Sequence, residues 1–220
     1  MAKVGAIING VDTLTQYGLC MLADLTISEP VVKESLVDLP GADGTLDYSE
    51  ALTGYPVFED RTVSFTLHKM MDEEERAQIR TDLLGRYGGR IVTLVTPDLP
   101  TYFWRGRITI GGLSDFNSGR IPISARVEPY RLKAAQTTVT ESLSANTEKT
   151  ITLVNAGMPT IPTIRCTKQC TVTVDGVAYT IPANTDYRND SLMITGLSTQ
   201  ITALAASSAS LTITYQEGVL

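Results

Sequence analysis

Apolar and polar residues alternate regularly between Arg61 and Lys69. Val63, Phe65 and Leu67 fall on one side of an extended chain, and polar residues occupy the positions between them. Such alternation is typical of a strand with one buried and one solvated face. Upstream, Leu36 to Leu39 ends another strand, and the loop Pro40 to Gly44 contains a proline and two glycines that favour a turn set by backbone geometry. We take residues 35–69 as the stretch around which the chain is organised.

The same reading of the pattern predicts further strands in the first half of the chain. They cover residues 4–9, 18–28, 31–39, 90–96, 102–110 and 121–127. We expect 31–39 to pair with 18–28, and 90–96 to be a central strand because it is apolar on both faces. Residues 111–119 are rich in Gly, Ser, Asp and Asn and predict a loop.

One helix is predicted, over residues 73–86. Asp72 is suited to be its N-cap and Glu75 to complete a capping box. Ile79, Leu83 and Tyr87 recur at helical spacing and predict the buried stripe, and Gly88-Gly89 predicts the end. Asp82 and Arg86 are spaced to form an ion pair within the helix.

The composition changes after Lys133. Residues 134–150 are rich in Ala, Thr, Ser and Asn without strong periodicity, which predicts a domain boundary between 1–133 and 134–220. The second domain is predicted to hold short strands at 150–154, 163–166, 171–174, 178–181, 192–195 and 211–215, with Asp175-Gly176 as a hairpin turn. The fold class is therefore mainly β with one helix: an N-terminal β-barrel-like or sandwich-like domain and a C-terminal β-sandwich.

Charge and cysteine content narrow the possible functions. The net charge is −6 and the isoelectric point about 4.8, which argues against specific nucleic-acid binding. No apolar run approaches the length of a membrane span, so we expect no membrane insertion. The cysteines are odd in number, and we expect Cys166 and Cys170 to be reduced thiols, with a hairpin disulfide or half a zinc site as alternatives.

No pattern of a catalytic site is present in the sequence. It contains no nucleophile elbow, phosphate-binding loop or zinc-protease motif, and its single histidine, His68, falls on the polar side of a strand. Three consecutive glutamates at 73–75 fit a solvated helix start better than a metal site. Four aspartates, Asp24, Asp38, Asp43 and Asp47, are close enough in sequence to converge. We expect no catalytic residue, cofactor or metal.

Several segments, in order, resemble the distal tail protein (Dit) family of long-tailed phages, the siphophages. In the first domain these are Leu39 to Asp47, Gly54-Tyr55, the Arg61 strand, the helix followed by Gly88 to Arg90, Arg105-Gly106 and Glu128 to Tyr130. In the second they are Val154 to Gly157, the strand after Pro162 and the ending Ile213 to Leu220. The likeness covers nearly the whole chain.

The resemblance implies a structural virion protein at the tail tip, made and assembled in the host cytoplasm. In that family the N-terminal domains form a hexameric ring that continues the tail tube, and galectin-like C-terminal sandwiches project from it. The implied partners are further copies of the chain, the major tail tube protein, tail-tip or tail-associated proteins and a receptor-binding protein. This baseplate hub has no enzymatic role.

For the subunit interface the candidates are Pro40, Gly41, Asp43 and Gly44 in the loop, and Glu74, Gln78 and Arg86 on the exposed side of the helix. The alternative reading of both sets is an ordinary hairpin loop and a solvated helix face. The alternative function is a carbohydrate-binding, lectin-like module in which Trp104, Tyr179 or Tyr187 stacks on a sugar. Residues 134–220 contain no His and no Trp, which weakens that alternative, and a cell-wall hydrolase is disfavoured by the missing catalytic groups.

Overall fold

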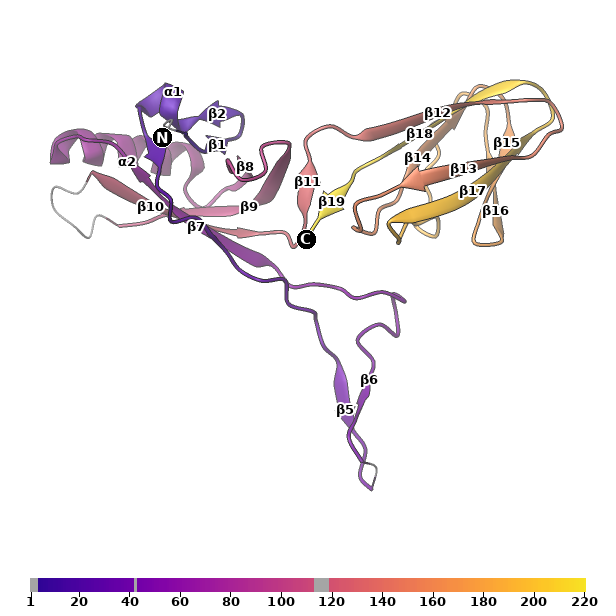
Figure 1. The fold of residues 1–220 in the computed structure, drawn as a ribbon, viewed down its shortest axis with the longest axis horizontal. Helices are drawn as coiled ribbons and strands as arrows, with labels where there is room; N and C mark the ends of the chain where they lie inside the picture. Colours follow the sequence, from indigo (N-terminus) through magenta and orange to yellow (C-terminus); the bar gives the residue numbers. More distant parts are fainter. Residues whose placement is uncertain (1–3, 42, 113–118) are drawn as a thin grey trace. The chain divides into compact units, whose positions relative to one another are not determined.

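The computed structural model describes residues 4–41, 43–112 and 119–220 (Figure 1). The chain divides into two compact units, Met1–Arg131 and Leu132–Leu220. The predicted loop at 111–119 falls largely outside the described residues. None of the described helices has the length and apolar character needed to cross a membrane.

The first unit is built on one antiparallel sheet. Its strands are β1 (Ile7–Ile8), β2 (Val11–Asp12), β3 (Cys20–Met21), β4 (Thr26–Ile27), β7 (Arg61–His68), β8 (Ile91–Val95), β9 (Tyr102–Ile110) and β10 (Arg120–Val127). The order is β2-β1-β8-β9-β10-β7-β3, and β4 also pairs with β7. In the long β7–β10 pair, Val63 lies opposite Ala125 and Phe65 opposite Ile123, so apolar residues of neighbouring strands share one face.

Helix α2 (Glu73–Tyr87) packs against strands β9 and β10. Asp72 caps it as predicted, accepting a hydrogen bond from the Glu75 amide at 2.8 Å. Leu83 and Tyr87 are buried, and Ile79 packs against the same core. A second helix, α1 (Thr13–Tyr17), was not predicted from the sequence.

The face of the sheet that does not join this core is polar. In the central parts of β9 and β10, buried or half-buried residues alternate with more exposed ones, which is typical of strands with one solvated face. Trp104 and Ile108 point into the core, whereas Arg105, Arg107 and Arg126 are exposed. Ile91 is 57% exposed, so the prediction that β8 is buried on both faces was wrong at its first residue.

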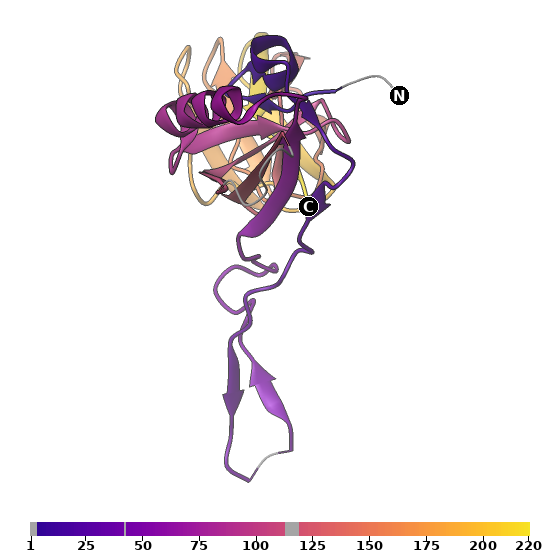
Figure 2. The same cartoon turned by 90° about the vertical axis from the view of Figure 1, so that its left-hand side faces the viewer.

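Residues 28–60 form a long hairpin that we call the arm (Figures 1 and 2). Its strands β5 (Leu36–Asp38) and β6 (Thr45–Asp47) are antiparallel, with Val37 opposite Leu46. Both views show the arm extending away from the sheet, and none of its described residues is buried. The predicted pairing of 31–39 with 18–28 was wrong: the turn at 40–44 folds the strand back on its own downstream neighbour instead.

The second unit is a β-sandwich. One sheet has the order β12-β18-β14 and the other β13-β17-β15-β16. Buried residues of both sheets, such as Ile213 and Ile201, form a single core. The bounds are β12 Thr137–Leu143, β13 Lys149–Val154, β14 Thr163–Cys166, β15 Cys170–Val174, β16 Val177–Ile181, β17 Ser198–Ala205 and β18 Ala209–Tyr215.

The ends of the second unit are joined to each other. Strand β11 (Arg131–Lys133) pairs with β19 (Gly218–Val219), and the Lys133 amide donates to the Glu217 carbonyl at 2.9 Å. Asp175 and Gly176 both have positive φ, 48° and 79°, as a type I′ hairpin turn requires. The fold class predicted from the sequence, mainly β with a C-terminal sandwich, is confirmed; its galectin-like character stays a prediction.

Three details of the second unit differ from the sequence-based prediction. Strand β12 lies within the segment read as a boundary, and β17 was not predicted. Residues 192–195 are not a strand; Ile194 makes only an isolated bridge to Thr160.

Candidate assembly surfaces

Four of the candidate interface residues lie at the tip of the arm. Pro40, Gly41, Asp43 and Gly44 are all exposed, and Ala42 between them lies outside the described residues. Gly41 and Gly44 have φ of 87° and 77°, values that favour glycine. Backbone geometry therefore shapes this tip, as the sequence predicted, and leaves the side chain of Asp43 free to contact another molecule.

Apolar side chains of the arm are open to solvent on both of its faces. Leu36, Val37, Leu39, Leu46 and Tyr48 are between 42% and 51% exposed. A two-stranded hairpin of this kind is at best marginally stable by itself. Contiguous exposed apolar residues are typical of a surface that another molecule covers.

The remaining candidates lie together on the exposed face of α2. Glu74, Gln78 and Arg86 line a shallow groove of about 580 Å³ whose bottom is made of the small residues Ala77, Thr81 and Gly85. Gln78 donates to Glu74 at 3.3 Å, and Arg86 pairs with Asp82 at 2.8 Å, the ion pair predicted from the sequence. The polar groups that edge the groove are thus held in place by their neighbours on the helix.

Asp82 also joins the two helices. The Tyr17 hydroxyl donates to Asp82 at 2.6 Å. Burial and this hydrogen bond raise the pKa of Tyr17 to about 12, and the hydrogen bonds from Tyr17 and Arg86 lower the pKa of Asp82.

The structure does not bring the two sets of candidate interface residues together. One set is at the arm tip and the other on α2, and both views show these two elements apart (Figures 1 and 2).

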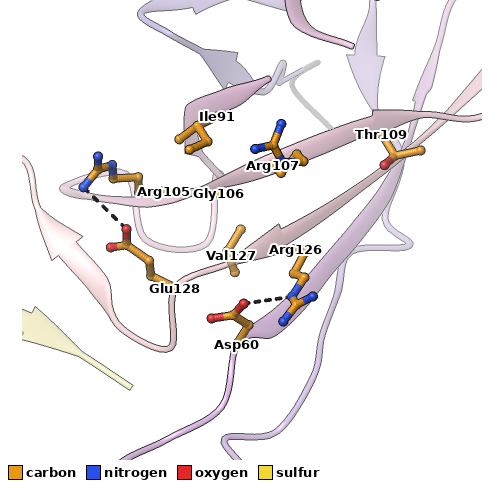
Figure 3. A pocket seen from close by; sticks show the side chains of 9 residues that line it. All are labelled: Asp60, Ile91, Arg105, Gly106, Arg107, Thr109, Arg126, Val127 and Glu128. Carbon is orange, nitrogen blue, oxygen red and sulfur yellow. Dashed lines mark hydrogen bonds and ion pairs between the residues drawn. The ribbon is translucent and has the colours of Figure 1, made fainter. Parts of the chain in front are cut away.

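A basic concavity on the polar face of the sheet was not predicted from the sequence. It measures about 490 Å³ and is lined by Asp60, Ile91, Arg105, Gly106, Arg107, Thr109, Arg126, Val127 and Glu128 (Figure 3). Arg126 pairs with Asp60 at 2.8 Å and Arg105 with Glu128 at 3.5 Å. Arg107 donates to the Gly89 carbonyl and has no carboxylate partner among the described residues. Alternation along β9 and β10 could have indicated this cluster, since it places the three arginines on one face.

Two arginines lie over the ring of Trp104 at the root of the arm. The Arg61 and Arg131 guanidinium carbons are 5.0 Å and 4.7 Å from its ring centroid. Arg61 also donates to the Ser28 carbonyl at 2.8 Å, which ties the first residue of β7 to the start of the arm. Arg131 pairs with Asp98 at 2.6 Å.

Two cysteines and two of the four aspartates singled out in the sequence each lie in a defined environment. Cys166 and Cys170 are buried free thiols, and burial, with Cys166 beside it, raises the pKa of Cys170 to about 12. Such a thiol is a poor nucleophile at neutral pH. Asp24 accepts from the Thr66 amide and Asp47 from the Ser49 amide, so the aspartates do not converge. Over residues 4–41, 43–112 and 119–220, no group of three His, Cys, Asp or Glu is arranged to hold a metal.

The aromatic residues proposed for sugar stacking are poorly placed for it. Trp104 is 1% exposed, so the prediction that its ring stacks on a sugar is wrong. Tyr179 and Tyr187 are half-buried against the core of the second unit. The Tyr179 hydroxyl donates to the Ser191 carbonyl, and the Tyr187 hydroxyl accepts from Asn189.

The fold has a close counterpart among solved structures. It is similar to the crystal structure of SPP1 Dit (gp 19.1), described as a paradigm of the hub adsorption apparatus in phages that infect Gram-positive bacteria, with a TM-score of 0.62 and 16% identity. The match covers 98% of this chain and 99% of that chain. A designed double-stranded β-helix, 13% identical, matches 36% of this chain and 97% of its own with a TM-score of 0.28, which supports no argument. The Dit fold suggested by the sequence is thus confirmed as a fold.

Comparisons of sequence alone give no relative. No protein-family model matches the chain, and no curated protein matches it.

Proposed function

We propose that this chain is a structural subunit of a phage tail-tip hub. The observation that carries the proposal is the similarity to a hub adsorption protein over 98% of the chain. The exposed apolar side chains of the arm support it, since they form a surface suited to assembly. The hub joins the tail tube to tip and adsorption proteins and has no enzymatic activity.

The hub is a ring of identical subunits, hexameric if it follows the family that the sequence resembles. The arm supports this part of the proposal, because its apolar side chains are exposed in the single chain and need a cover. Sheet edges are a second reason, since cyclic assembly pairs or covers edges that a lone subunit leaves open.

We assign two surfaces to this ring. The arm tip, with Pro40, Gly41, Asp43 and Gly44, contacts a neighbouring copy. The α2 groove, edged by Glu74, Gln78 and Arg86, receives either a neighbouring copy or one of the tail proteins. Among those, the proposed partners are the major tail tube protein, the tail-associated protein and a receptor-binding protein, and the proposed location is the tail tip of the virion.

The location is tested by electron microscopy of purified phage particles labelled with an antibody against this chain. We expect label at the junction of the tail tube and the tip, and no label on capsids. A matched sample with the antibody pre-adsorbed to the pure chain serves as the control. Label on the capsid, along the whole tube, or on no part of the particle contradicts the proposal.

A further inference from the structure

The outer part of the arm, which includes its tip, is strongly acidic. Residues 34–50 contain five carboxylates and no Lys or Arg: Glu34, Asp38, Asp43, Asp47 and Glu50. All of them are exposed. The Asp47 carboxylate accepts a hydrogen bond from the Ser49 amide, and no ion pair is formed by any of the five among the described residues.

The acidic groups are interleaved with the exposed apolar side chains. Leu36 lies opposite Asp47 and Val37 opposite Leu46 across the hairpin. A surface that covers this hairpin must therefore offer positive charge and apolar contact together, because burying an unpaired carboxylate is costly.

The basic concavity of the first unit offers both. Its three guanidinium groups face two carboxylates, which leaves one positive charge in excess. Ile91, 57% exposed, supplies apolar surface at its rim, and Gly106 adds no side chain to it. Each guanidinium has five N–H donors, so the contacts that Arg105, Arg107 and Arg126 make within the chain leave donors for incoming carboxylates (Figure 3).

Three other hollows are less suitable for an acidic hairpin. The α2 groove carries Glu74 and Asp82 against Arg86, and a hollow beside the arm root carries Glu59 and Asp60 against Lys33 and Arg126. A hollow in the second unit has Lys168 as its only charged residue. The concavity alone among the four combines several guanidinium groups with an apolar rim.

We propose that the acidic arm of one copy docks in the Arg105–Arg107–Arg126 concavity of another copy. This rests on the proposed function, in which copies assemble, and adds to it which surface receives the arm. Carboxylates of the arm pair with the arginines, and Val37 and Leu46 cover Ile91. Arm and concavity are different surfaces, so the contact is head-to-tail and closes into a ring when the rotation permits.

A charge-reversal experiment on the full chain tests the docking. One variant reverses the concavity (Arg105→Glu with Arg107→Glu), a second reverses the arm (Asp38→Lys with Asp47→Lys), and a third carries all four changes. Association is measured by sedimentation equilibrium. We expect each double variant to raise the dissociation constant for self-association at least about tenfold, and the quadruple variant to restore it, because opposite charges again meet between copies.

Arg165→Glu is the matched control, because the Arg165 side chain is 56% exposed, like that of Arg105, and belongs to the second unit. Unchanged association in this control together with the rescue supports the proposal. If the concavity variant associates as strongly as the wild type, the docking is overturned and the proposed function stands. The same holds if the concavity variant loses only its binding to the tail tube protein. A wild-type chain that never associates, alone or with that protein, contradicts the proposed function itself, and the docking with it.

Discussion

Trp104 is the single tryptophan of the chain, and its environment depends on two long side chains. The guanidinium groups of Arg61 and Arg131 both lie over its ring. Arg61 is 8% exposed, and its Nη1 has no hydrogen-bond partner among the described residues. Burial and the neighbouring Arg131 charge lower the pKa of Arg61. The two guanidinium groups therefore help to exclude water from the indole, and the desolvation of the Arg61 charge opposes this gain in stability.

Replacing Arg61 with Ala opens one face of the indole to water. We expect the tryptophan emission of Arg61→Ala to shift to longer wavelength and its unfolding free energy to fall by about 1–3 kcal/mol. Arg61→Met keeps an apolar stem without the buried charge, so its emission should stay near that of the wild type. Identical emission from Arg61→Ala and wild type would show that the arginine does not cover the ring in solution.

Glu217 holds the end of the second unit against its beginning. It is 8% exposed, and it accepts hydrogen bonds from the Lys133 ammonium at 2.6 Å and from the Thr137 hydroxyl. Burial pushes the pKa of Glu217 upward, but the contacts with Lys133 and Thr137 outweigh burial, and the pKa lies below its ordinary value of 4.5. A carboxylate whose pKa is lower in the folded state stabilises the fold above the unfolded pKa, and this contribution is lost as the pH falls through the folded pKa.

Glu217→Gln should therefore lower the unfolding free energy by about 1–3 kcal/mol at neutral pH. The difference from the wild type should shrink as the pH falls below 4.5, where the wild-type carboxylate takes up its proton. Urea unfolding over this pH range measures both effects. Glu141→Gln is the control, because the Glu141–Lys149 pair is 35% and 40% exposed and should contribute less than about 1 kcal/mol. A difference that is constant with pH would contradict this assignment.

Single residues were predictable where their partners are near in sequence. The Asp72 cap, the Asp82–Arg86 pair and the Asp175-Gly176 turn follow from spacing and residue type alone. The stack on Trp104 joins residues 61, 104 and 131, and no local pattern links them. Tyr17 was not predicted as a second partner of Asp82 for the same reason: the two residues are far apart in the sequence.

At the scale of elements, β9 and β10 approach each other closely at Gly106. A Cβ atom added at Gly106 would lie 2.1 Å from the Arg126 carbonyl oxygen, which is backbone and cannot move aside cheaply. Gly106 lies opposite Val127 in the pair and lines the basic concavity. The register of these two strands thus depends on the absence of a side chain at this position.

Gly106→Ala should destabilise the first unit by about 1–3 kcal/mol, because the two strands must separate locally to accommodate the methyl group. Chemical unfolding followed by tryptophan emission reports this directly, since Trp104 lies on β9. Gly112→Ala is the matched control: no atom of the described residues lies within 4 Å of its added Cβ, and we expect stability near that of the wild type. Equal stability of Gly106→Ala and wild type would mean that the strands are farther apart than described.

Elements were predictable in proportion to the regularity of their apolar pattern. Strand β9 has the predicted bounds, and α2 extends one residue past them. Helix α1 has five residues, too few for a helical period to appear. Strand β12 has apolar residues only at Val139 and Leu143, and β17 begins with three polar residues, Ser198 to Gln200, so the apolar pattern of both strands is weak. The strand that pairs with residues 31–39 was predicted wrongly, because the turn at 40–44 determines that partner and the apolar pattern does not.

At the scale of the whole molecule, the sequence resemblance and the fold comparison point to the same architecture. The fold was predictable because several short segments keep their order along the chain, although only 16% of residues are identical to the solved counterpart. The surface proposed to receive the arm was not predictable, because a surface made of Asp60, Ile91, Arg107 and Arg126 exists only after β7, β8, β9 and β10 are aligned. The proposed role in assembly rests partly on which side chains are exposed, and sequence spacing does not show their exposure.

The central claim is that copies of this chain assemble with each other through the arm. Sedimentation velocity of the pure chain, alone and with the tail tube protein, compares the wild type with a variant in which Leu36, Val37 and Leu46 become Ser, Thr and Ser. We predict that the wild type sediments as a multiple of the 23.8 kDa chain, and that the variant stays a single chain with an unchanged unfolding transition, because the three side chains are exposed. A wild type that remains a single chain in both conditions, or a variant that assembles equally well, would contradict the account.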